Sequence, residues 1–105
     1  MTTKYQIIYW RDIPAQVKVK AERQRSGRPL SDLFQDAIDR AAMHAGKTDS
    51  DAYLAEWRNG EWQEREGAPE ELLDALIAEL ETGYPVHRLQ QIIQNGGWEA
   101  AGDAS

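Results

Sequence analysis

The chain has 105 residues, of which 41% are hydrophobic and 29% charged, with a formal net charge of −6. These values are typical of one soluble globular domain with a single core. The absence of cysteine excludes disulfides and thiolate nucleophiles, and it fits a reducing compartment. Residues 1–10 show no signal-peptide pattern and no apolar run is long enough to span a bilayer, so we expect a cytoplasmic protein without membrane contact.

Two strands are predicted at the N-terminus. Residues 5–10 are aromatic and β-branched with apolar side chains on both faces, which is typical of a central strand. Residues 15–20 alternate, so we expect their valines to point inward and their lysines outward. The short connection over residues 11–14 predicts an antiparallel hairpin.

A loop and a helix should follow. Residues 22–29 have no hydrophobic period and contain Ser26-Gly27, which predicts an exposed loop. Apolar residues then recur at helical spacing from Leu33 to Ala45, and Gly46 is a natural stop.

The segment around Asn59-Gly60 has two interpretations. This dipeptide is a strong signal for a two-residue β-hairpin turn, with positive φ at both positions and Trp57 paired with Trp62. The alternative is a short helix over residues 50–58. We favour the hairpin, which would give a four-stranded sheet.

The C-terminal third reads as two helices. Pro69, two acidic residues and a leucine stripe predict a helix that ends at Gly83, and a shorter helix runs from Pro85 to Asn95. We expect one domain over residues 1–98 and a frayed tail over residues 99–105. The fold class is therefore α+β, with two layers: a small antiparallel sheet in the order ββα-ββ-αα and helices packed on it.

Three stretches carry a resemblance to a known family: IYWRDIPAQV at residues 8–17, FQDAIDRAAM at 34–43 and DAYLAEW at 51–57. They resemble a small bacterial domain family described as virulence factor. The family occurs as stand-alone chains, and a similar domain is fused to helical-repeat scaffold proteins of staphylococcal type. The resemblance implies gene neighbourhoods of one-carbon or methyl-transfer metabolism, and it implies no catalytic residues.

The turn Trp10-Arg11-Asp12 is a candidate ligand site. Arginine binds carboxylates or phosphates through two hydrogen bonds, and an adjacent aromatic ring can hold a planar ligand. The alternative is structural: Asp12 caps the turn, Arg11 pairs with an acid and Trp10 packs in the core.

The basic stretch is a candidate docking surface or anion site. Residues 1–30 contain seven basic and two acidic residues, whereas residues 31–105 contain five basic and sixteen acidic residues. The candidate surface consists of Lys18, Lys20, Arg23, Arg25 and Arg28. The alternative is an edge strand protected by lysines and followed by a solvated loop.

No residue is singled out as catalytic, metal-binding or cofactor-binding. His44 and His87 have no second metal ligand at a recognised spacing, and no serine lies in a nucleophile elbow. We expect a non-enzymatic accessory module, without a cofactor, that docks on a larger protein with an acidic surface, and that binds no nucleic acid because the acidic body would repel a polyanion. The alternative is a small-molecule or anion-binding domain, or a minor enzyme subunit, with its site near Trp10 and Arg11.

Overall fold

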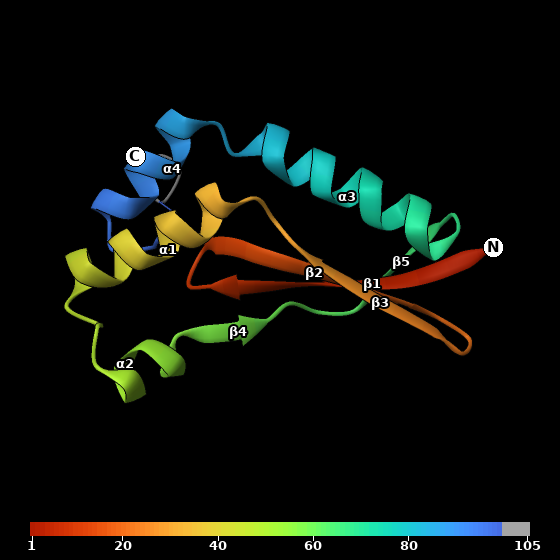
Figure 1. Ribbon diagram of the computed structural model, residues 1–105, viewed down its shortest axis with the longest axis horizontal. Coiled ribbons are helices and arrows are strands. Elements are labelled where there is room, and N and C mark those ends of the chain that lie inside the picture. The colour runs from red at the N-terminus through yellow and green to blue at the C-terminus, as the bar shows by residue number, and fades with distance from the viewer. Residues whose placement is uncertain (100–105) are drawn as a thin grey trace.

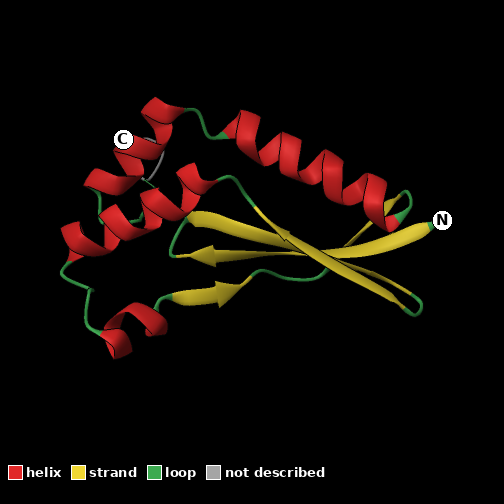
Figure 2. Ribbon diagram, in the orientation of Figure 1, coloured by secondary structure: helices red, strands yellow, loops and turns green. Residues whose placement is uncertain are grey.

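The computed structural model describes residues 1–99. In chain order, the elements are β1 (Thr2–Trp10), β2 (Ile13–Ala21), β3 (Gln24–Pro29), α1 (Asp32–Ala45), α2 (Ser50–Ala55), β4 (Trp57–Asn59), β5 (Gln63–Glu66), α3 (Pro69–Gly83) and α4 (Val86–Gln94). Figures 1 and 2 show α3 running along the sheet, with α1 and α4 beyond one end of it and α2 next to β4. The α+β fold with an antiparallel sheet is confirmed.

β1 is the centre of the sheet, as its two apolar faces predicted. The order is β3-β2-β1-β4, and β5 also pairs with β1. β4 lies opposite the end of β1 at Ile8–Trp10, and β5 lies opposite its beginning at Thr2–Tyr5. β4 and β5 therefore share one edge of β1 instead of pairing with each other.

A β-bulge shifts the register of the first hairpin. Tyr9 lies opposite Pro14, but Ile8 lies opposite Gln16, so Ala15 is the extra residue. Proline has no N–H to donate, and a bulge is one of the few places where a strand tolerates it. The shift places Val17 opposite Ile7, and directly opposite side chains share a face of the sheet.

The helices cover one face and one end of the sheet. Val17 and Val19 are buried with Leu72, Leu73 and Leu76 of α3, which confirms that these valines point inward. A second core forms at the turn end of the hairpin, where α1 and α4 meet the sheet; it contains Trp10, Ile13, Leu30, Phe34, Ile38, Leu89 and Ile92. Ile77 and Leu80 of α3 pack against both cores.

The helix boundaries follow the sequence signals closely. α1 has Ser31 as its N-cap, and Gly46 ends it in the left-handed conformation at φ 70°. α3 begins at Pro69 and includes Gly83. The buried face of α1 is narrower than its apolar spacing predicted, since Leu33 is 45% exposed, and Val86 at the start of α4 is 53% exposed.

Two sequence-based predictions are wrong. Residues 24–29 form strand β3, paired with β2 across their length, where we expected a loop. The Asn59-Gly60 hairpin is absent: residues 50–55 are helical, and Gly60 is not among the glycines with positive φ. Gly60 instead donates its N–H to the carbonyl of Ile7 at 2.8 Å. The free edge of β1 thus captures both segments that the hairpin would have paired.

No helix within residues 1–99 is long and apolar enough to cross a bilayer. The predicted frayed tail begins at Glu99, whose carboxylate accepts two hydrogen bonds from Arg88, and the rest of it lies outside the described residues.

Candidate functional site

A row of charged side chains crosses the sheet face that points away from α3. Lys4 of β1 lies directly opposite Lys20 of β2, and Lys20 lies directly opposite Arg25 of β3. On the other side of β1, Lys4 lies opposite Glu64. Like charges at directly opposite positions destabilise a sheet. The fold therefore holds three cations together in a row at some cost to its own stability.

Lys18 extends this row into a basic face, defined as Lys4, Lys18, Lys20 and Arg25. Lys18 is exposed, and it lies opposite Gln6 on one side and Gly27 on the other. Among residues 1–99, none of the four cations of the basic face is in an ion pair. Their charges are available to an external anion.

A shallow hollow of about 380 Å³ lies along the row. Lys4, Lys20 and Arg25 line it, with Glu22 and Glu64 also in its wall. Beyond this hollow, the ammonium group of Lys20 lies 4.3 Å from the ring centroid of Trp62, which is 41% exposed. A cation over an indole ring is attracted to it, so Trp62 holds the Lys20 side chain on this face.

The structure separates the five residues of the predicted docking surface. Lys18, Lys20 and Arg25 lie together on the basic face. Arg23 lies in the exposed turn between β2 and β3. Arg28 lies on the opposite side of β3, where it forms ion pairs with Asp74 and Glu70 of α3, and the hydrogen bond with Asp74 raises the pKa of its guanidinium. Arg28 thus fastens β3 to α3.

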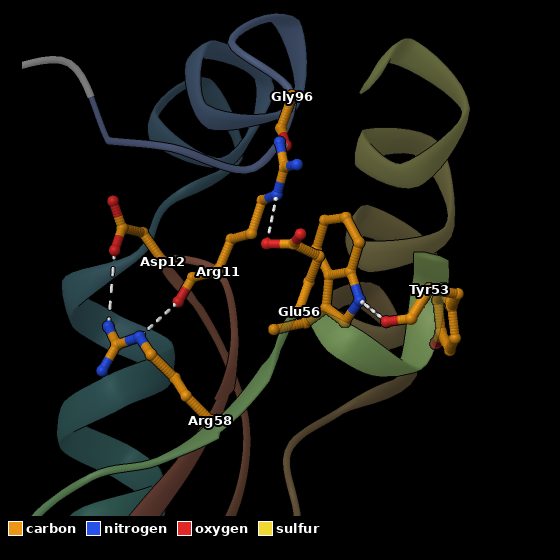
Figure 3. Close-up of polar contacts among 7 residues, drawn as sticks. Arg11, Asp12, Tyr53, Glu56, Arg58 and Gly96 are labelled. Atoms are coloured by element: carbon orange, nitrogen blue, oxygen red, sulfur yellow. Dashed lines mark hydrogen bonds and ion pairs between the residues drawn. The ribbon is translucent and has the colours of Figure 1, made fainter. Parts of the chain in front are cut away.

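Trp10 and Arg11 are buried at the other end of the hairpin. The indole N–H of Trp10 donates to the carbonyl of Tyr53 at 2.9 Å. Arg11 adopts a left-handed conformation at φ 52°, and its Nε donates to Glu56 at 3.0 Å while its Nη1 donates to the carbonyl of Gly96 at 2.9 Å. Figure 3 shows the Arg11 side chain reaching Glu56 and the Gly96 loop from the turn.

Asp12 completes this network. Its carboxylate accepts the backbone N–H of Glu99 at 2.7 Å. It also accepts a hydrogen bond from Arg58 at 3.4 Å (Figure 3). The Arg11 guanidinium lies 4.9 Å from the ring centroid of Trp98, which is 47% exposed. Trp10 packs in the core and Arg11 pairs with an acid, as in the structural alternative, whereas the Asp12 carboxylate binds Arg58 and the backbone of Glu99 instead of capping the turn.

A polar hollow of about 410 Å³ lies beside Asp12. Tyr9 and Tyr84 line it, and burial raises the pKa of both phenols, so both are neutral at pH 7. The guanidinium of Arg58 lies 4.3 Å from the Tyr9 ring centroid and donates to the carbonyl of Arg11. The hollow has hydrogen-bonding groups, but its main cation already binds within the chain.

The histidines are both exposed and stand apart from these sites. His44 lies in the last turn of α1, as its place in the sequence predicted, and His87 lies in the first turn of α4. In the part of the chain that the structure describes, no three or more histidine, aspartate or glutamate side chains converge on a possible metal position.

A protein-family model described as virulence factor matches residues 8–93. The match includes the turn at Arg11, all of β3, and Lys20 and Arg25 of the basic face. The chain belongs to the virulence factor family. No curated protein and no solved structure matches this chain. The description of this virulence factor family names no reaction.

Sequence reasoning missed three residues of the basic face and its surroundings. The sequence contains no signal that groups Lys4 with the later cations, because only the bulge brings it opposite Lys20. The pattern around Asn59-Gly60 places Trp62 in a hairpin, whereas its position over Lys20 depends on the loop between β4 and β5. The pattern of residues 22–29 predicts a loop, whereas Gly27 lies in β3. The clean alternation of residues 15–20 was the one available signal that the lysines share an outer face.

Proposed function

We propose that this virulence factor domain is a non-enzymatic docking module, which binds an acidic surface of a larger protein through its basic face. The observation that carries the proposal is the row Lys4, Lys20 and Arg25, in which like charges lie directly opposite one another. An anionic partner surface would neutralise this repulsion, so binding would recover stability that the isolated fold lacks.

The charge distribution supports a protein partner over a nucleic acid. Behind the basic face, the first turns of α3 carry Glu70, Glu71 and Asp74, and the whole chain has a net charge of −6. An acidic body behind a basic face orients an approaching acidic protein, whereas it repels a long polyanion.

The alternative site at Trp10 and Arg11 has less support. Two donor groups of the Arg11 guanidinium are already bound to Glu56 and Gly96, and only 9% of the residue is exposed. A ligand would have to replace hydrogen bonds that hold the turn in place.

The test is capture of the partner from the native cell with a tagged full-length chain. The variant Lys20→Glu/Arg25→Glu should lose capture by at least about tenfold, because the row then repels an acidic surface. Arg28 is left unchanged, since its reversal would disturb α3. The matched control is Arg40→Glu, an exposed residue of α1 that forms an ion pair with Asp36.

The proposal requires that Arg40→Glu capture as well as the unaltered chain, and that the captured protein present an acidic surface. Undiminished capture by Lys20→Glu/Arg25→Glu would overturn it, and so would a nucleic acid as the captured molecule. The metabolic setting implied by the family resemblance, one-carbon or methyl-transfer metabolism, stays a prediction that the identity of the partner tests.

A further inference from the structure

β3 is an edge strand with a free backbone edge beside the basic face. It stands at the end of the strand order, and among residues 1–99 it pairs only with β2. The N–H of Leu30 donates to the carbonyl of Ala15 at 2.9 Å, which sets the orientation of the preceding residues. Backbone N–H and C=O groups alternate in direction along a strand. The backbone groups of Ser26 and Arg28 therefore point toward β2, and those of residues 25, 27 and 29 point away from the sheet.

Pro29 fits this orientation, because a proline at an outward position of an edge strand removes no ladder hydrogen bond. It leaves Arg25 and Gly27 as the residues of β3 that present unpaired N–H groups on the outer edge. Both are exposed. An extended chain could pair with this edge at both positions.

Gly27 is not required by the fold. Its φ lies outside the left-handed range that favours glycine, and an added Cβ would meet only the Val17 carbonyl oxygen at 3.5 Å and Lys18 Cγ at 3.7 Å. Those are ordinary van der Waals distances, so most small side chains would fit. Glycine inside a strand costs stability, and it commonly marks a place where another backbone or a ligand comes close.

Resting on the proposed function, we propose that the partner binds as an added β-strand on the free edge of β3, with an acidic side chain at every second position. Side chains of the added strand opposite residues 25 and 27 lie over the basic face. One acid would then meet Arg25, and the next would cross the bare backbone of Gly27 toward Lys18, which lies directly opposite Gly27.

The intervening positions of the added strand have a different environment. They lie opposite Ser26 and Arg28, on the side of the sheet that α3 covers with Glu70 and Asp74. Arg28 is already paired with both of these acids, and the cluster of the three has a net charge of −1, so further acidic side chains are disfavoured there and these positions should carry small uncharged residues. The recognised segment is therefore an extended stretch in which acids alternate with residues such as threonine.

The probe is a short synthetic peptide that alternates glutamate and threonine, with both ends blocked, added to the full-length chain. A second peptide of the same sequence carries methyl groups on the backbone nitrogens of its glutamates. These nitrogens would face β3, so methylation removes the donors of the edge that pairs with β3. We expect the methylated peptide to bind at least about tenfold more weakly, since two backbone hydrogen bonds are lost. In the complex with the unmethylated peptide, hydrogen exchange of the N–H groups of Arg25 and Gly27 should slow.

A pair of variants tests the role of the glycine. Gly27→Thr should leave the melting temperature unchanged or higher and weaken peptide binding by about tenfold, because its side chain covers the path to Lys18. Ser26→Thr, whose side chain points to the other face, should bind the peptide as the unaltered chain does.

The outcomes separate strand addition from docking. If both peptides bind equally, if exchange at residues 25 and 27 is unaltered, or if no peptide binds, strand addition is overturned, while docking stands as long as Lys20→Glu/Arg25→Glu abolishes capture. If that double variant captures the partner normally, docking fails, whatever the peptides do.

Discussion

At the scale of the residue, Arg11 joins three segments that are distant in sequence. Its backbone closes the first hairpin, and its side chain binds Glu56 after α2 and Gly96 after α4. The side chain is largely buried, so each of these hydrogen bonds lies in a medium of low polarity. A buried group left without its partner costs more free energy than the bond itself contributes.

Replacing Arg11 should therefore destabilise the domain strongly. Arg11→Met removes the guanidinium from beside the rings of Trp10 and Trp98, and it leaves the Glu56 carboxylate and the Gly96 carbonyl without their partner. We expect the free energy of unfolding to fall by about 2–4 kcal/mol in denaturant titrations. Arg40→Met, at an exposed position of α1, is the control and should change it by less than about 0.5 kcal/mol.

Gly60 is also required at its position, for a reason other than the predicted turn. A Cβ there would lie 2.8 Å from the carbonyl oxygen of Ile7, a backbone atom that cannot move without disturbing β1. Gly60→Ala should lower the free energy of unfolding by about 1–3 kcal/mol. Gly83→Ala, where nothing lies within 4 Å, should instead raise the melting temperature slightly, and equal melting temperatures for the two variants would contradict this assignment.

At the scale of the element, β3 uses its two faces for different tasks. Arg28 binds Asp74 and Glu70 of α3, whereas Arg25 lies opposite Lys20 on the basic face. Alternation along the strand separates two arginines that are close in sequence. One arginine stabilises the fold and the other is left available for a partner.

Charge reversal should distinguish the two arginines in thermal denaturation. Arg28→Glu should lower the melting temperature, because it replaces attraction to α3 by repulsion. Arg25→Glu should raise it slightly, because the new carboxylate lies opposite Lys20. A drop in melting temperature for both variants would show that Arg25 also stabilises the fold and would weaken its assignment to docking.

The contact between Arg88 of α4 and Glu99 should make the stability of the fold depend on pH. The hydrogen bond from Arg88 lowers the pKa of Glu99 below its ordinary value. The ionised carboxylate therefore stabilises the folded state above the unfolded pKa of 4.5, and this contribution is lost as the pH falls through the lower folded pKa. Titration by NMR should give Glu99 a depressed pKa that Arg88→Gln returns toward normal; an unchanged pKa in the variant would contradict the pairing.

At the scale of the whole molecule, α3 links the two cores. Ile77 and Leu80 pack against the core at the hairpin turn and against the core beneath α3. Apolar contacts that are shared between clusters make their loss cooperative. The domain should therefore unfold in one transition.

Leu73→Ala tests this cooperativity. Leu73 belongs to the core beneath α3, and its truncation should lower the free energy of unfolding by about 2–5 kcal/mol. The unfolding midpoint measured by tryptophan fluorescence, which reports on buried Trp10 of the other core, should shift by the same amount as the midpoint measured by far-ultraviolet circular dichroism. Two separate transitions would mean that the cores are independent.

Local patterns in the sequence determined the periodic elements. The leucine stripe and Pro69 specify α3, Gly46 ends α1, and the alternating valines specify which side of β2 is buried. Such signals depend on neighbours within a few residues, so they survive without tertiary context. The position of the lysines on an outer face follows from the same alternation.

Pairing between distant strands decided where β4 and β5 lie and which residues of β1 and β2 are opposite one another. Asn59-Gly60 has a strong turn propensity, but the free edge of β1 offered each flanking segment a strand partner, and both segments pair there. Without the bulge at Ala15, Lys4 would lie opposite Val19; the one-residue shift brings it opposite Lys20 instead. The row of three cations thus depends on a register that is set by packing across the sheet, beyond the reach of any local pattern in the chain.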